Sequence, residues 1–263
     1  LPLIQYSIVL DGGHILAPKD KAGIADFLAS MLMEGTANKT PEELENAIES
    51  IGARISAFAS NENITISGTT LSKHFDDTMD LVSEILLEPR WYENEFDLLK
   101  QSTLSRIQRG KANPNQIAEN EFSKLLYGEQ NILAYDNNGT EASVERISIL
   151  DLKAYYENNL SPTLTNLHVV GAISEDKVVT ALENINSNWN AKEVSLPELP
   201  LPLFPETSKV YFYDVPGAKQ SVIRFGYPSL KATDDNYYAT TVMNYRLGGG
   251  GFASQLTQQL REG

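Results

Sequence analysis

Side chains that could bind a metal or act as nucleophiles are few in this sequence and widely spaced. There is no cysteine, so disulfides, thiolate zinc sites and cysteine nucleophiles are excluded. The histidines His14, His74 and His168 have no partner four residues away that would share a helical face, and we expect ordinary surface or core positions for them. Four glycines at positions 248–251 are not followed by Lys and Ser or Thr, so we interpret them as a bend between helices and not as a phosphate loop.

The composition is that of a globular protein without a nucleic-acid partner. The 263 residues are 41% hydrophobic and 21% charged, enough for one large or two modest domains with real cores. The net charge of -14 argues against nucleic-acid binding, because neutralising phosphates requires clustered Lys and Arg. No apolar run approaches the roughly 20 residues needed to span a bilayer.

The most informative stretch is residues 23–36, which we predict to be one amphipathic helix running into a glycine turn. Its apolar residues recur at steps of three and four and therefore share a face. They are Ile24, Phe27, Leu28, Met31 and Leu32. Gly35 follows the periodic run, where a helix usually ends.

Hydrophobic periodicity and capping residues predict the other elements. We expect strands at 3–10, 54–59 and 63–70, a buried strand at 164–172, and helices at 40–51, 75–87, 93–109, 117–127, 149–158 and 175–189. This order indicates an α+β sandwich with helices on one face of a sheet. The alternating prolines of residues 196–205 indicate an extended, stiff linker.

The pattern restarts after that linker. We expect strands at 209–214 and 221–226, a helix at 236–247 and another from about residue 254. The predicted division is a first domain at 1–195, a linker at 196–208, and at 209–263 the beginning of a second, truncated domain, which is too short for an independent core of this type.

Three stretches resemble the insulinase/pitrilysin family of inverted zinc metallopeptidases, which includes the mitochondrial processing peptidases. Residues 23–36 resemble the family phrase G-x-A-H-F-L-E-H-M-L-x-x-G-T. Residues 214–221 resemble D-x-P-G-A-x-Q-S, and residues 247–263 resemble L-G-G-x-x-x-S-R-L-x-x-x-L-R-E. The resemblance covers essentially the whole chain. It implies an α+β sandwich of helices on a mixed, mainly antiparallel sheet, followed by the start of a second, similar domain.

The residues that bind zinc in the family are replaced in this chain. In H-x-x-E-H the two histidines bind the metal and the glutamate is the general base. Asp26 stands at the first histidine, Ala29 at the glutamate and Ser30 at the second histidine. The third ligand is a glutamate about 75 residues later, and Arg106, 76 residues after Ser30, or its neighbour Ser105, occupies that position. We therefore expect no metal and no cofactor in this chain.

Opposite charges stand at two of the replaced positions. We hypothesise that Asp26 and Arg106 pair across the former metal site, within the roughly 4 Å of an ion pair. The alternative is that each side chain faces solvent.

Two further features of the family map onto this chain. Arg261 matches the Arg of an Arg/Tyr pair that binds substrate and stabilises its oxyanion, although Gln255 stands where Arg is common. The Tyr would fall just after Gly263. Peptide substrates of the family add as an extra strand near N-A-x-T. Here Ser56, Ala57 and Phe58 align with that phrase as candidate substrate-binding residues, the alternative being a plain sheet strand.

The resemblance implies the non-zinc half of a two-half peptidase. Such a half would bind a peptide substrate and contribute Arg261 in trans to a partner half that carries the zinc, either as a separate subunit or as the N-terminal half of the same chain. By itself the chain would be inactive. The alternative is a non-catalytic structural or peptide-binding subunit of a larger assembly. Because bacterial relatives are often exported, we expect a periplasmic location, with the cytoplasm as the alternative.

Overall fold

A computed structural model of the chain describes residues 2–199, 201–202, 206–226 and 228–262, without the side chains of Asn184, Arg261 and Glu262. The chain forms two compact units, the first comprising Leu1–Leu203 with Val210–Arg224 and the second Phe204–Lys209 with Phe225–Gly263. The division into a first domain, a linker and a second domain at the predicted boundaries stays a prediction.

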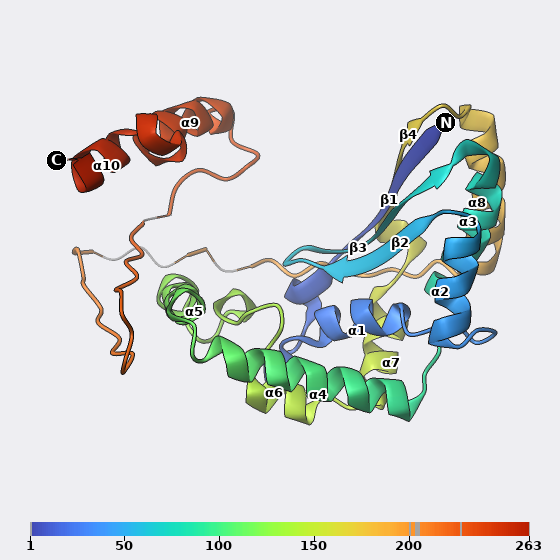
Figure 1. The fold of residues 1–263 in the computed structure, drawn as a ribbon, viewed down its shortest axis with the longest axis horizontal. Coiled ribbons are helices and arrows are strands. Elements are labelled where there is room, and N and C mark those ends of the chain that lie inside the picture. Colours follow the sequence, from blue (N-terminus) through green and yellow to red (C-terminus); the bar gives the residue numbers. More distant parts are fainter. Residues whose placement is uncertain (1, 200, 203–205, 227, 263) are drawn as a thin grey trace. The chain divides into compact units, whose positions relative to one another are not determined.

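The first unit is built on one four-stranded sheet, in which every neighbouring pair of strands is antiparallel (Figure 1). The strands are β1 (Leu3–Asp11), β2 (Arg54–Ala59), β3 (Asn63–Leu71) and β4 (Thr165–Gly171), in the spatial order β2-β3-β1-β4. Alternate side chains of a strand point to opposite faces of the sheet, and one of these two faces is buried in the core. Its buried residues include Ile4, Tyr6, Ile8, Leu10, Ile64 and Ile66. The predicted mainly antiparallel sheet is confirmed.

The helices of this unit are α1 (Ile24–Leu32), α2 (Pro41–Ser50), α3 (Phe75–Leu87), α4 (Glu93–Gly110), α5 (Pro114–Tyr127), α6 (Glu141–Arg146), α7 (Ile149–Asn159) and α8 (Glu175–Asn188). Helices α1, α2 and α3 contact the strands, while α4 and α7 pack against α1 and α8 packs against α3. Short 3-10 turns include Gly13–Leu16, Lys19–Lys21, Ser72–His74, Ile132–Ala134 and Pro162–Leu164. Every helix predicted in this unit is present. The additional helix, α6, is less than two turns long, so hydrophobic periodicity does not reveal it.

Helix α1 is the centre of the core. It contacts β2 and β3 on one side and α4 and α7 on the other, and the rings of Phe27 and Phe96 join α1 to α4 edge to face at 5.3 Å. Seven of its nine residues are buried, including Ala25 and Ala29 outside the predicted apolar stripe. A helix covered on two sides buries more than one stripe, and the polar residues Asp26 and Ser30 are left half-buried.

Two strand predictions after the linker are wrong. Residues 209–214 and 221–226 have no regular secondary structure. Alternating apolar residues stabilise a strand only when a neighbouring strand supplies the ladder of hydrogen bonds, and no described strand pairs with these segments. Val210 and Phe212 are accordingly 98% and 90% exposed.

The predicted buried strand at 164–172 is present as β4, but it is not buried. It is an outer strand with β1 as its neighbour, and residues such as His168 and Val170 face solvent. Its apolar composition resembles that of a central strand, whereas its place at the edge depends on which strands pair, and composition does not encode pairing.

The second unit contains short helices. Helix α9 (Tyr237–Asn244) continues into a π-helical turn at Tyr245–Gly249, a 3-10 turn follows at Gly251–Ala253, and α10 (Gln255–Thr257) leads into a π-helical turn at Gln258–Glu262. The two predicted helices are thus present with interrupted geometry. Among the described residues, no helix combines the length and apolar character needed to cross a bilayer.

Candidate functional site

The residues that the family resemblance predicts at the positions of the metal ligands and the general base, here called the former metal site, lie on two crossing helices. Asp26, Ala29 and Ser30 are on α1, and Arg106 is on α4, which packs across α1. Helix α1 begins after Gly23, whose backbone has φ +100, and a Cβ there would come within 2.8 Å of the Asn138 carbonyl oxygen. Glycine at this position therefore allows the 136–140 loop to lie against the beginning of α1.

Asp26 and Arg106 form an ion pair across the two helices. Arg106 Nη2 donates to Asp26 Oδ2 over 3.1 Å, so the predicted pair is confirmed. It joins α1 to α4 across 80 residues of sequence. Ala29 is buried and Ser30 is half-buried on the same helix, and neither has an imidazole or carboxylate to contribute.

The pair lies in a partly desolvated setting. Burial raises the pKa of the Asp26 carboxyl above its ordinary value, and Asp136 raises it further, while the charge and hydrogen bond of Arg106 and the nearby His14 oppose the rise. The cation on Arg106 therefore compensates a carboxylate that its surroundings disfavour. Asp136 itself accepts hydrogen bonds from Gln116 and Asn138.

His14 is a buried residue beside this cluster. Its Nε2 lies 3.2 Å from the Ile132 carbonyl oxygen and 3.1 Å from that of Tyr135, so Nε2 carries the proton and donates to both. Its Nδ1 is buried without a hydrogen-bond partner among the described residues, and burial lowers the pKa of the imidazole. The prediction of an ordinary core or surface position holds for the three histidines: His74 pairs with Asp77, and His168 is exposed on β4.

The residues at the former metal site do not fit zinc. Structural and catalytic zinc sites use imidazole, thiolate and carboxylate ligands. Of the residues at positions 26, 29, 30 and 106, Asp26 alone has a carboxylate, and it is bound to a guanidinium. A cation fixed at the position of the third ligand would also repel the metal. In the part of the chain that the structure describes, no group of three His, Cys, Asp or Glu residues is placed to hold a metal ion.

Ser56, Ala57 and Phe58 lie on a strand with a free edge. Strand β2 pairs with β3 and has no partner on its other side among the described strands. Ser56 Oγ donates to the Ser67 carbonyl oxygen on β3, and the Phe58 side chain is half exposed on the open face of the sheet. An edge of this kind can accept an extended peptide as an additional strand.

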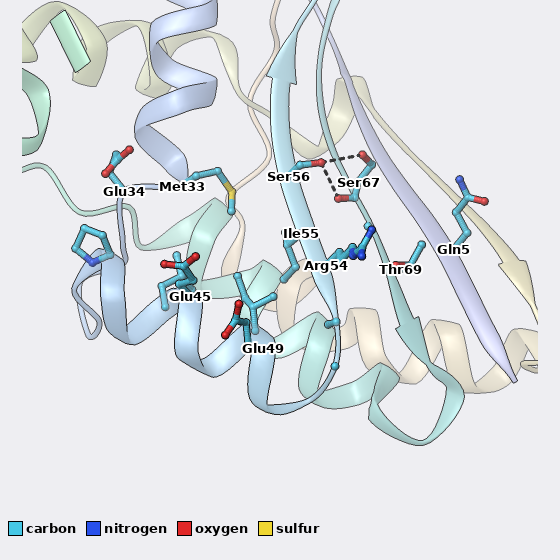
Figure 2. Close-up of a pocket in the computed structure, with 16 residues that line it drawn as sticks. Gln5, Met33, Glu34, Glu45, Glu49, Arg54, Ile55, Ser56, Ser67 and Thr69 are labelled. Atoms are coloured by element: carbon cyan, nitrogen blue, oxygen red, sulfur yellow. Dashed lines mark hydrogen bonds between the residues drawn. The ribbon is translucent and has the colours of Figure 1, made fainter. Parts of the chain in front are cut away.

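A groove of about 1160 Å³ borders the beginning of β2 (Figure 2). Helix α2 forms one wall through Pro41, Leu44, Glu45, Ile48 and Glu49, which recur at helical spacing and share a face. The other wall consists of Arg54, Ile55 and Ser56 on β2, with Ser67, Gly68 and Thr69 on β3. Sequence reasoning identified Ser56 but not the α2 wall, because an acidic helix face has the same pattern whether it borders a groove or open solvent.

Arg261 belongs to the π-helical turn Gln258–Glu262. Its side chain lies outside the described residues, so its predicted role stays a prediction.

Comparison with known proteins gives the family. Residues 4–134 match the family described as insulinase (peptidase family M16), and residues 146–263 match the family described as peptidase M16 inactive domain. This chain therefore belongs to peptidase family M16, as its sequence motifs predicted.

Curated relatives carry different names. The chain is 27% identical over 240 residues to "Uncharacterized zinc protease YmxG" of Bacillus subtilis, covering 91% of this chain and 57% of that protein. It is 25% identical over 270 residues to "Non-peptidase homolog YmxG" of Helicobacter pylori, covering 99% and 60%. It is 22% identical over 263 residues to "Probable mitochondrial-processing peptidase subunit beta, mitochondrial" of Arabidopsis thaliana, covering 95% and 49%. The chain thus spans about half to three fifths of the length of these relatives.

Solved structures share the fold. A crystal structure of the peptidase M16 inactive domain from Pseudomonas fluorescens matches with a TM-score of 0.84 at 22% identity, covering 100% of this chain and 63% of that one. A protease from Helicobacter pylori matches with a TM-score of 0.69 at 19% identity, covering 76% and 48%. The predicted α+β processing-peptidase-like fold is confirmed.

Proposed function

We propose that this chain is the half of an M16 peptidase that does not bind zinc, and that it holds an extended peptide for a zinc-bearing partner half. The ion pair between Asp26 and Arg106 carries the proposal. It keeps the two helices of the former metal site together while occupying the positions of two metal ligands. A chain of this kind contributes binding and not the metal chemistry itself.

The free edge of β2 supports the peptide-binding part. A peptide adding there would form main-chain hydrogen bonds with β2 and pass Ser56, Ala57 and Phe58. Because β2 ends the sheet and a groove lies beside its first residues, a strand has room to add without displacing a described element.

Arg261 is the residue that we assign to the shared reaction. A guanidinium directed at the substrate carbonyl would stabilise the negative charge that develops on its oxygen during hydrolysis. The partner would be another half of the same protein or a separate subunit with an intact H-x-x-E-H. The tyrosine of the pair would follow Gly263, and the periplasmic location stays a prediction.

A second candidate is a non-catalytic structural or peptide-binding subunit. The observation that favours it is the relative from Helicobacter pylori whose name describes a non-peptidase homolog, and which aligns with 99% of this chain.

The test is hydrolysis of quenched fluorescent peptides by a mixture of this chain with an H-x-x-E-H half from the same genome. We expect the mixture to cleave peptide, Arg261→Ala to lose most of that rate, and Arg246→Ala, a matched loss of a cation in the same unit, to keep it. A mixture that binds peptide without cleaving it would favour the second candidate. Full activity of Arg261→Ala would refute the role of that residue.

A further inference from the structure

The 136–140 loop contains the dipeptide Asn138-Gly139, which is the only asparagine followed by glycine in the sequence. Such an asparagine can react with its own main chain, because glycine has no side chain to shield its amide nitrogen. That nitrogen loses its proton and attacks the side-chain carbonyl carbon of the asparagine. A cyclic imide forms as ammonia leaves, and water then opens the ring to aspartate or isoaspartate.

The packing of the loop against the beginning of α1 requires glycine at position 139. Gly139 is buried with φ +81, and a Cβ there would come within 2.2 Å of the Ala22 carbonyl oxygen. In the same contact, a Cβ at Gly23 would come within 2.8 Å of the Asn138 carbonyl oxygen. The glycine that makes Asn138 reactive therefore has no larger substitute that would leave the loop in place.

Hydrogen bonds occupy both of the groups that would react. The Gly139 backbone nitrogen donates to the Asp136 carbonyl oxygen over 2.8 Å. The Asn138 side-chain Nδ2 and backbone nitrogen donate to Asp136 Oδ1 over 2.7 and 2.8 Å. Ser143 Oγ, on α6, donates to the Ala22 carbonyl oxygen over 2.8 Å and joins the end of the loop to the same place. Ring closure therefore requires the loop to open.

We propose that Asn138 is a deamidation site, protected while the 136–140 loop lies against the beginning of α1 and reactive when this loop opens. The reaction consumes water and releases ammonia, and it needs no other reactant. Opening a single loop needs less free energy than unfolding the whole chain, so the rate at Asn138 reports on this contact. The inference does not depend on the proposed function.

The product does not fit the place of the asparagine. Deamidation replaces the Asn138 amide, which donates to Asp136, by a second carboxylate, and the two like charges repel each other. Isoaspartate also adds a methylene group to the main chain, so the contacts with Ala22 and Gly23 cannot both be kept. Modification therefore weakens the packing of the loop on α1, the helix that carries Asp26.

The experiment follows, by mass spectrometry, the peptide that contains Asn138 while the full chain is kept at mildly alkaline pH, either folded or in urea. We expect the folded chain to react at least about tenfold more slowly, because only the opened fraction reacts. Asp136→Ala removes the acceptor of the Asn138 amide and should speed the reaction of the folded chain about fivefold, the scale of one net hydrogen bond. Asp136→Ser keeps a weaker acceptor and should react at an intermediate rate.

Two matched variants separate the loop from the rest of the molecule. Thr40→Ala removes the cap of α2 and destabilises the chain elsewhere, so it should leave the rate at Asn138 unchanged. Asn138→Asp supplies one of the two products directly and should lower the melting temperature. Asn137→Asp adds the same charge one residue earlier and should lower it less.

Four results would overturn the inference. If Asn138 stays intact in urea, it is not a deamidation site. If it reacts equally fast in the folded chain and in urea, the loop does not protect it. If Thr40→Ala speeds the reaction as much as Asp136→Ala does, unfolding of the whole chain and not opening of the loop controls the rate. Equal melting temperatures of Asn138→Asp and Asn137→Asp would refute the predicted loss of the contact with α1.

Discussion

Replacing Arg106 by methionine removes the cation at the former metal site and keeps most of the aliphatic stem. The Arg106 side chain is 51% exposed and that of Asp26 is 22% exposed. Because Arg106 is well solvated, water screens the pair, and we expect a coupling of about 0.5–1 kcal/mol in a double-mutant cycle with Asp26→Asn. For a chain of this size that corresponds to a fall in melting temperature of roughly 2 °C.

The effect should depend on pH in a defined direction. Burial raises the pKa of Asp26 in the folded state above its unfolded value. Between the two values the folded state binds more protons, so the contribution of Asp26 to stability falls as the pH rises through that window. Arg106→Met removes the compensating cation and should cost most at pH 7, and least at acidic pH, where Asp26 is protonated in both proteins. Asp26→Asn should cost less than Arg106→Met, because it leaves no uncompensated carboxylate.

The assay is chemical unfolding of the four proteins of the cycle at pH 7 and at acidic pH, followed by circular dichroism. Arg109→Met is the matched control, since Arg109 is an exposed arginine on the same helix without an ion-pair partner among the described residues. Equal effects of Arg106→Met and Arg109→Met at both pH values would refute the reasoning, because the pair would then contribute nothing beyond a surface charge.

Three further predictions concern the same fold. Burial lowers the pKa of His14 below its ordinary value, so below about pH 6.5 the unfolded state binds more protons than the folded state. The unfolding free energy should therefore fall as the pH falls through that range. The His14→Gln variant should show a shallower fall of its unfolding free energy. Thr40→Ala removes the hydroxyl that caps α2 in a capping box with Glu43, and should cost about 1 kcal/mol in urea unfolding; an unchanged midpoint would contradict that role. Restoring the family's ligands should create a zinc site measurable by calorimetry, because the ligand positions remain on crossed helices, and failure of the folded variant to bind zinc would show that they have moved apart. The ligand substitutions are Asp26→His, Ser30→His and Arg106→Glu, and Ala29→Glu restores the general base beside them.

Local sequence patterns were sufficient to predict most of the helices and strands of the first unit. Strong periodicity and capping residues predicted α2 and α3 within about one residue, because these elements have apolar stripes and start signals of their own. The pairing of Asp26 with Arg106 needed more than local pattern. The two residues are 80 positions apart, and the family's ligand spacing is what related them.

Features that depend on tertiary pairing were not predictable. The segments 209–214 and 221–226 have the alternation of strands, but they have no described partner to pair with. His14 is buried, and its Nε2–H donates hydrogen bonds to carbonyl groups 118 and 121 residues away, which local sequence does not reveal. The acidic wall of the groove was missed because periodicity locates Glu45 and Glu49 on an exposed helix face without showing that β2 lies in front of it.

The central claim is that this chain keeps the scaffold of a zinc peptidase half without the metal. The most direct measurement is the zinc content of the purified chain after incubation with excess zinc and removal of unbound metal by gel filtration. The account predicts far less than one zinc per chain, unchanged by Asp26→Asn. One zinc per chain, lost on substitution of Asp26 or Ser30, would contradict it.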